Sequence, residues 1–162
     1  GGFHVFSDIT AQEVEILNML DIMTPTGVRE VKEYMRYILT KQYRREVMAA
    51  VFHNKLLSNL FHSLLFLVER DDFDVAQVQK RVQQIKQIYY AIFDQVHNKY
   101  SKVVEDLDSN EVVREFGRIS FENLERAFKQ GQLSLIRMEV INFYQEYNKL
   151  GKKSDARQIV AV

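Results

Sequence analysis

Residues 47–68 read VMAAVFHNKLLSNLFHSLLFLV, and their apolar side chains cover nearly every side of a helix. The positions that place apolar side chains on these sides are Val47, Met48, Val51, Phe52, Leu56, Leu57, Leu60, Phe61, Leu64, Leu65 and Leu67. A helix that is apolar all round is one surrounded by other helices, because each of its faces must be shielded from water. The stretch therefore predicts a long, buried central helix.

Two capped helices are expected before this stretch. Thr10 and Glu13 have the spacing of a capping box, in which each side chain satisfies a backbone amide of the first turn. Thr24 is placed to cap the next helix and Pro25 to open it, since proline lacks the amide hydrogen that the first turn leaves unpaired. The apolar stripe of the first helix indicates that it lies against something larger. The second helix could continue as one rod to Glu69, or bend on the way.

A third helix after the acidic junction at 71–74 has the strictest apolar spacing in the chain. Its apolar positions follow in steps of three and four, at Val75, Val78, Val82, Ile85, Tyr89, Ile92 and Val96, with Val103 resuming the series. Such a heptad-like seam suits a long neighbouring helix, from the same chain or from a second copy. The surface predicted for pairing comprises Val75, Val82, Ile85, Val96, Ile136 and Val140.

The remaining helices are delimited by glycines. Gly117 is expected to end a short fourth helix, and Gly131 to end the turns that follow. A last helix over 133–150 should stop at Gly151. The predicted fold is all-α, a bundle of about five helices with a long buried central helix and a heptad-patterned third helix. The predicted organisation is a flexible N-terminus or tag remnant over 1–9, a single helical domain over 10–151 and a tail over 152–162.

Composition restricts the class of protein. Apolar residues make up 46% and charged residues 27%, which is ordinary globular usage and argues against disorder. Lysine plus arginine equals aspartate plus glutamate at 22 each, so no net field attracts phosphates and direct nucleic-acid binding is not expected. Cysteine is absent, and the longest apolar run, Leu64–Val68, is far below the roughly 20 residues of a membrane span. A cytoplasmic location without a membrane span is expected.

No constellation of residues indicates catalysis, a metal or a cofactor. The four histidines, His4, His53, His62 and His97, lack a second ligand at metal-binding spacing. A haem-ligating His62 or His97 in a globin-like bundle is the specific alternative. The acidic clusters fall at predicted helix junctions, where carboxylates cap backbone amides. We therefore expect no enzyme and no catalytic, cofactor-binding or metal site.

Aromatic residues are numerous, with 8 tyrosines and 11 phenylalanines, and many have helical spacing. Core packing explains most of them. The alternative is an elongated apolar pocket for a lipid or other hydrophobic effector, lined by Phe52, Leu56, Phe61, Tyr89 and Phe93. The basic run over 41–45 is either a solvated face or a contact for an acidic partner.

Residues 10–45 contain TAQEVEIL at 10–17 and MTPTGVREVKEYMRYILTKQ at 23–42. This part resembles the segment after the DNA-binding head in bacterial repressors of the Cro/phage-repressor helix-turn-helix class. There, a short acidic helix, a Thr/Ser-Pro cap and an amphipathic helix lead into a dimerisation or effector domain. The resemblance implies that this chain is the regulatory part, and it carries over no site residues because the matching positions are structural.

The predicted function is a non-catalytic regulatory module of bacterial signalling or transcription control. It would act by dimerisation, as a homodimer, or by binding a partner protein. The alternative is a sensor domain that binds an apolar small molecule, such as a fatty acid, in a globin-like helical core. An enzyme ranks third.

Overall fold

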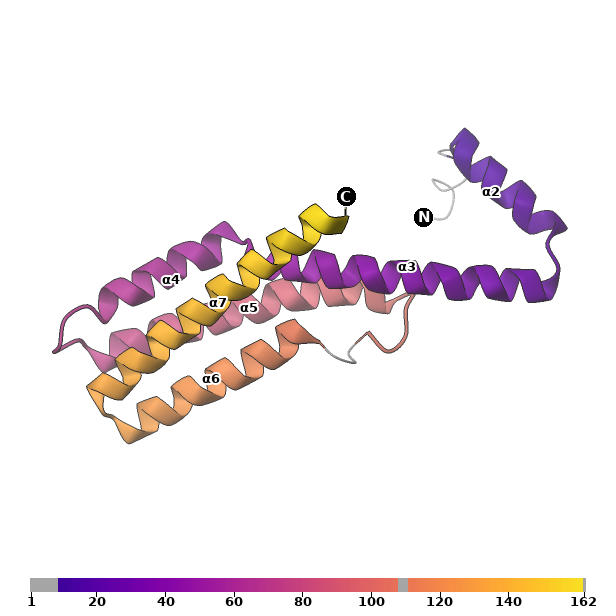
Figure 1. Cartoon of the computed structure of the whole chain (residues 1–162). Coiled ribbons are helices and arrows are strands. Elements are labelled where there is room, and N and C mark those ends of the chain that lie inside the picture. The colour runs from indigo at the N-terminus through magenta and orange to yellow at the C-terminus, as the bar shows by residue number, and fades with distance from the viewer. Residues whose placement is uncertain (1–8, 108–110, 162) are drawn as a thin grey trace. The chain divides into compact units, whose positions relative to one another are not determined.

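The computed structural model describes residues 9–107 and 111–161, with side-chain surroundings described through Ser154. These residues form six helices and no strand, which confirms the all-α prediction, although about five helices were expected. The helices are α2 (Ala11–Ile22), α3 (Pro25–Phe52), α4 (Lys55–Leu67), α5 (Val75–Ser101), α6 (Val112–Gln130) and α7 (Leu133–Ala161) (Figure 1). Within the described ranges, no helix combines the length and hydropathy needed to cross a bilayer.

The chain divides into two compact units, Gly1–Ile38 and Leu39–Val162. Unit 1 contains α2 and the first part of α3. Unit 2 contains the rest of α3 and the helices α4 to α7. The N-terminal segment predicted over 1–9 lies outside the described residues except for Ile9.

The two helices of unit 1 begin at the caps that the sequence predicts. The Thr10 hydroxyl accepts a hydrogen bond from the Glu13 amide at 3.2 Å, and the Thr24 hydroxyl accepts one from the Gly27 amide at 3.1 Å. Pro25 is the first residue of α3, as expected. Each cap satisfies an amide that the first helical turn leaves without an intrahelical partner, so the starts of both helices are set by local sequence.

The stretch over 47–68 forms two helices, and the prediction of one long central helix is therefore wrong. Helix α3 ends at Phe52, and α4 begins at Lys55. Asn54 causes the break, because its side chain accepts a hydrogen bond from the Leu57 amide at 3.0 Å and caps α4. Both parts still contribute to the core of unit 2, with Val47, Val51, Leu57, Phe61 and Leu64 almost fully buried.

Helices α4 to α7 form a four-helix bundle. Four pairs of helices pack together, α4 with α5, α5 with α6, α6 with α7, and α7 with α4, so the helices close into a ring (Figure 1). The seam of α5 faces the interior: Val78, Val82, Ile85, Tyr89, Phe93, Val96 and Tyr100 are buried, in steps of three and four. The heptad-like pattern predicted for the third helix is confirmed from Val78 to Val96, with Phe93 buried and Ile92 only partly buried. The prediction that Val103 resumes the series is wrong, because α5 ends at Ser101 and Val103 is 60% exposed.

The last turns of α3 are joined to this bundle by hydrogen bonds and ring contacts. The Tyr147 hydroxyl donates to the Val51 carbonyl at 2.7 Å, and the Tyr43 hydroxyl donates to the Glu111 carboxylate at 2.6 Å. The Tyr43 ring meets the Tyr100 ring edge-on, with centroids 5.4 Å apart. These contacts make the end of α3 a fifth packed element of unit 2.

Two of the glycines expected to end helices lie within them instead. A Cβ atom at Gly117 would lie 2.8 Å from a ring carbon of Tyr89, so this glycine lets α6 approach α5 closely. A Cβ atom at Gly151 would lie 3.2 Å from the Phe52 carbonyl oxygen, so this glycine lets α7 approach the end of α3 closely. Helix α7 continues past Gly151 to Ala161. Only Gly131 acts as the sequence predicts, ending α6 with a left-handed φ of 77°.

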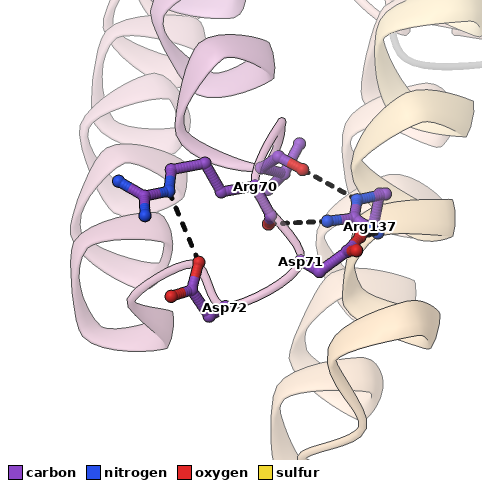
Figure 2. Close-up of polar contacts among 5 residues, drawn as sticks. Arg70, Asp71, Asp72 and Arg137 are labelled. Atoms are coloured by element: carbon purple, nitrogen blue, oxygen red, sulfur yellow. Dashed lines mark hydrogen bonds and ion pairs between the residues drawn. The ribbon is translucent and has the colours of Figure 1, made fainter.

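Arg137 on α7 holds the carboxyl end of α4, as Figure 2 shows. Its guanidinium donates to the Val68 carbonyl at 2.7 Å and to the Arg70 carbonyl at 2.6 Å, and it pairs with Asp71 at 3.1 Å. The last carbonyls of a helix have no intrahelical partner and carry partial negative charge. Arg137 therefore stabilises both the end of α4 and its packing against α7.

Replacing Arg137 with methionine is expected to lower the free energy of unfolding by about 1–2 kcal/mol, because two carbonyls lose charge-assisted hydrogen bonds. Arg137→Lys should lose nearly as much unfolding free energy as Arg137→Met, since an ammonium group cannot reproduce the forked hydrogen bonds of the guanidinium. Urea unfolding measures the effect. Arg70→Met is the control, because the Arg70 side chain is exposed and forms a surface ion pair with Asp72, at 3.4 Å. An equal loss of unfolding free energy in both variants would contradict the role assigned to Arg137.

Candidate interaction surface

Helix α2 has no buried residue, although seven of its twelve residues are apolar. Leu17 is 52% exposed and Ile22 is 87% exposed, and the side chains of Val14, Ile16 and Met19 are exposed too. The sequence predicted a single stripe lying against something larger, but the apolar residues are spread around the helix, and within the described chain only Leu20 is partly shielded. Apolar groups held in water are costly, at about 25 cal/mol per Å².

The first part of α3 also presents apolar side chains to solvent. Tyr34, Met35, Tyr37 and Ile38 are all exposed, and the rings of Tyr34 and Tyr37 stack with centroids 6.3 Å apart. Neighbouring exposed apolar side chains of this kind mark interaction sites more often than scattered single ones do. We call the exposed apolar side chains of unit 1 the α2–α3 surface: Val14, Ile16, Leu17, Met19, Ile22, Tyr34, Met35, Tyr37 and Ile38.

The turn between α2 and α3 is tight. The Met23 amide donates to the Leu20 carbonyl at 3.2 Å and ends α2, and Pro25 opens α3 two residues later. The Met23 side chain folds over Gly27, where a Cβ atom would lie 2.7 Å from the Met23 Cγ. Both helices of unit 1 are thus fixed at their junction by local contacts.

The structure places four of the five residues predicted to line an apolar pocket in the core of unit 2. Phe52, Phe61, Tyr89 and Phe93 are buried, whereas Leu56 is exposed. Phe52 and Phe61 both contact the Tyr147 ring, with centroids 5.3 and 4.4 Å away, and Tyr89 contacts Phe116 at 6.1 Å. These rings pack on other side chains of the chain.

The six residues predicted as a pairing surface also lie inward. Val82, Ile85 and Val96 on α5 and Ile136 and Val140 on α7 are buried in the core, and Val75 is partly buried against it. The sequence left open whether the α5 seam pairs within the chain or with a second copy. The seam packs within the chain, on the helices of the same bundle.

Buried tyrosine hydroxyls of unit 2 are engaged in structural hydrogen bonds. Burial raises the pKa of Tyr89 and of Tyr147 well above the usual range, so both hydroxyls stay protonated. Tyr89 donates to the Val113 carbonyl, and Tyr147 donates to the Val51 carbonyl. At the bundle surface, hydrogen bonds from Tyr100 and then Lys99 lower the pKa of Glu46. These groups link helices to one another.

His62 and His97 lie on different helices of unit 2, α4 and α5. His97 stacks on the Phe93 ring, with centroids 5.6 Å apart, and His62 Nε2 lies 3.5 Å from the Tyr144 hydroxyl. His53 is exposed at the junction of α3 and α4, and His4 lies outside the described residues. In the part of the chain that the structure describes, no three His, Asp or Glu residues are grouped so as to hold a metal ion.

Sequence reasoning missed the full extent of the α2–α3 surface. Met19 and Ile22 lie off the stripe that the apolar spacing of α2 predicts. Their positions in the sequence already indicate that α2 is apolar on more than one side. Comparison with protein-family models, with curated proteins and with solved structures finds no match to this chain.

Proposed function

We propose that this chain is a non-catalytic regulatory module that acts by pairing through the α2–α3 surface. The observation that carries the proposal is that α2 has no buried residue despite its apolar composition. A helix of about 12 residues is only marginally stable in water by itself, and packing normally supplies the stability that it lacks. A second protein surface would supply that packing.

Charge favours a second copy of this chain as the partner. Helix α2 contains Glu13, Glu15 and Asp21 and no lysine or arginine. The first part of α3 contains Arg29, Lys32 and Arg36 beside Glu30 and Glu33, all on exposed positions, so its net charge is +1 against −3 for α2. A two-fold pair that lays α2 of one copy on α3 of the other brings opposite charges together around an apolar centre, as isologous interfaces require.

The resemblance of residues 10–45 to the segment after the DNA-binding head of bacterial repressors supports a role in signalling or transcription control. The α2–α3 surface lies within that segment. In this proposal, pairing of two chains brings two attached domains together, which is how a regulatory part would act on a DNA-binding or signalling part. The sensor alternative lacks such support. Four of the five side chains predicted to line its pocket, Phe52, Phe61, Tyr89 and Phe93, are buried in the core and pack on other side chains of the chain.

Sedimentation at micromolar concentration tests the proposal. The unaltered chain is expected to associate, and the double variant Leu17→Ser/Ile22→Ser should associate about tenfold more weakly or not at all, because apolar anchors dominate interface energies. Hydrogen exchange at α2 should slow as the chain concentration rises. The control is Phe66→Ser/Val103→Ser, which removes two apolar side chains of unit 2 that are 70% and 60% exposed.

Equal loss of association in both double variants would show that general surface hydrophobicity, not the α2–α3 surface, drives pairing. A monomer whose α2 amides are already protected would contradict the proposal outright, since α2 would then be covered by its own chain. A monomer with unprotected α2 amides would exclude self-pairing and would require a different protein as partner.

A further inference from the structure

A groove lies between α6 and α7 on the outside of the four-helix bundle. It encloses about 310 Å³, and its floor is formed by Phe116 and Ile119 of α6 and Phe143 of α7. The Phe116 and Phe143 rings are stacked, with centroids 5.8 Å apart and planes 24° from parallel. Ile119 is exposed. The floor is therefore apolar, with Ile119 as its exposed part, Phe116 partly buried and Phe143 buried beneath them.

The wall on the α7 side is acidic. Glu139 and Glu146 line the groove, and neither has an ion pair or hydrogen bond with any residue that the structure describes. Nearby carboxylates of α6 are already paired: Glu115 with Arg118 at 2.7 Å, and Glu125 with Lys86 at 3.2 Å. Charge that is uncompensated beside an apolar floor favours a cationic, partly apolar occupant.

The groove is elongated. A second hollow of about 220 Å³ shares Asn123 and Glu139 with it and continues toward the turn at Gly131, as far as Leu135 and Gln130. Glu139 and Glu146 are seven residues apart on one helix, which places them two turns or about 10 Å apart on the same face. Arg126 lines the second hollow together with the shared Glu139. Positive charge on an occupant is therefore favoured in the first hollow, which both glutamates line and no lysine or arginine does.

We propose that this groove binds a basic amphipathic helix of a partner protein. Its apolar residues would lie on Phe116, Ile119 and Phe143, and its lysine or arginine side chains would pair with Glu139 and Glu146. A second copy of this chain docked on the same groove would bring unpaired carboxylates together. A linear polyamine could reach both glutamates, but it would leave the second hollow and much of the exposed Ile119 uncovered.

Fluorescence anisotropy with the full chain and a labelled synthetic peptide tests the proposal. The probe is a helical peptide of about 18 residues with leucines at helical spacing and two lysines seven residues apart. It is expected to bind, with an affinity that falls as salt rises. Glu139→Gln/Glu146→Gln should weaken binding about five- to twentyfold, and Ile119→Ser should weaken it independently of salt.

The matched control is Glu69→Gln/Asp94→Asn, which removes the same charge from exposed positions on other parts of unit 2. This variant should bind the peptide as tightly as the unaltered chain does. The α2 variant Leu17→Ser/Ile22→Ser should do so too, and this result would distinguish peptide binding at the groove from pairing through the α2–α3 surface. No peptide binding up to millimolar concentration would overturn the proposal. So would equal weakening by the control pair, or binding of spermidine at the two glutamates in place of the peptide.

Discussion

Replacing Phe61 with alanine is expected to lower the free energy of unfolding by about 3–5 kcal/mol. Phe61 is fully buried, and its ring lies 4.7 Å from the Phe143 ring and 4.4 Å from the Tyr147 ring between centroids. Removal of the ring leaves a cavity lined by side chains of two helices, which cannot collapse without moving α7 toward α4. Urea unfolding followed by circular dichroism measures the loss.

Phe66→Ala is the matched control, because Phe66 is on the same helix and is 70% exposed. Its effect should stay within about 0.5 kcal/mol, as is usual for surface positions. If the two variants lost similar stability, α4 would not present Phe61 to the core. Such a result would contradict the arrangement of the whole bundle.

Replacing Gly117 with valine is expected to lower the free energy of unfolding by about 1–3 kcal/mol, although valine is the better helix former. The added Cβ atom would lie 2.8 Å from the buried Tyr89 ring and 2.9 Å from the Tyr90 hydroxyl. Relief requires α6 to move away from α5, which would strain the hydrogen bond that Tyr89 donates to the Val113 carbonyl.

Two further measurements separate close packing from a general effect of valine in α6. Glu122→Val, at a position 55% exposed on the same helix, should cost much less. Tyr89→Leu should cost less in the Gly117→Val background than in the unaltered chain, since contacting sites are not additive. Additive losses would show that Gly117 and Tyr89 do not meet, and would contradict the approach of α6 to α5.

Features that depend on neighbouring residues could be predicted from the sequence. The caps at Thr10 and Thr24 and the opening of α3 at Pro25 are confirmed because each involves a hydrogen bond or backbone angle within four residues. The inward seam of α5 is confirmed because helical spacing alone sets which side chains share a face. Local geometry was sufficient in these cases.

Glycine shows where local reasoning fails. Judged from neighbouring residues alone, Gly117, Gly131 and Gly151 would each be expected to end a helix. Of these three, only Gly131 takes the left-handed conformation. The other two allow close contact with Tyr89 and with the Phe52 carbonyl, residues far away in the sequence. Without knowledge of which helices pack together, a glycine that ends a helix cannot be told from one that permits contact.

The candidate surfaces were harder to predict for a similar reason. An apolar stripe indicates that a helix face is covered but not what covers it, so the α5 seam was equally compatible with a second copy. The structure uses that seam within the bundle and leaves apolar side chains on α2 exposed instead. The groove between α6 and α7 depends on two helices at once, so no single helical pattern reveals it.

The ring formed by α4 to α7 has a consequence for folding kinetics. Three of its four helix pairs join helices that follow each other in the chain, whereas the pairing of α7 with α4 closes the ring from its two ends. Chains rich in local contacts fold rapidly, because little loop entropy is lost before each contact forms. The three sequential pairs are expected to form early, and the α4–α7 pairing, which includes the contacts of Arg137 and of Phe61 with Phe143, to form late. Substitutions there should speed unfolding while leaving the folding rate nearly unchanged.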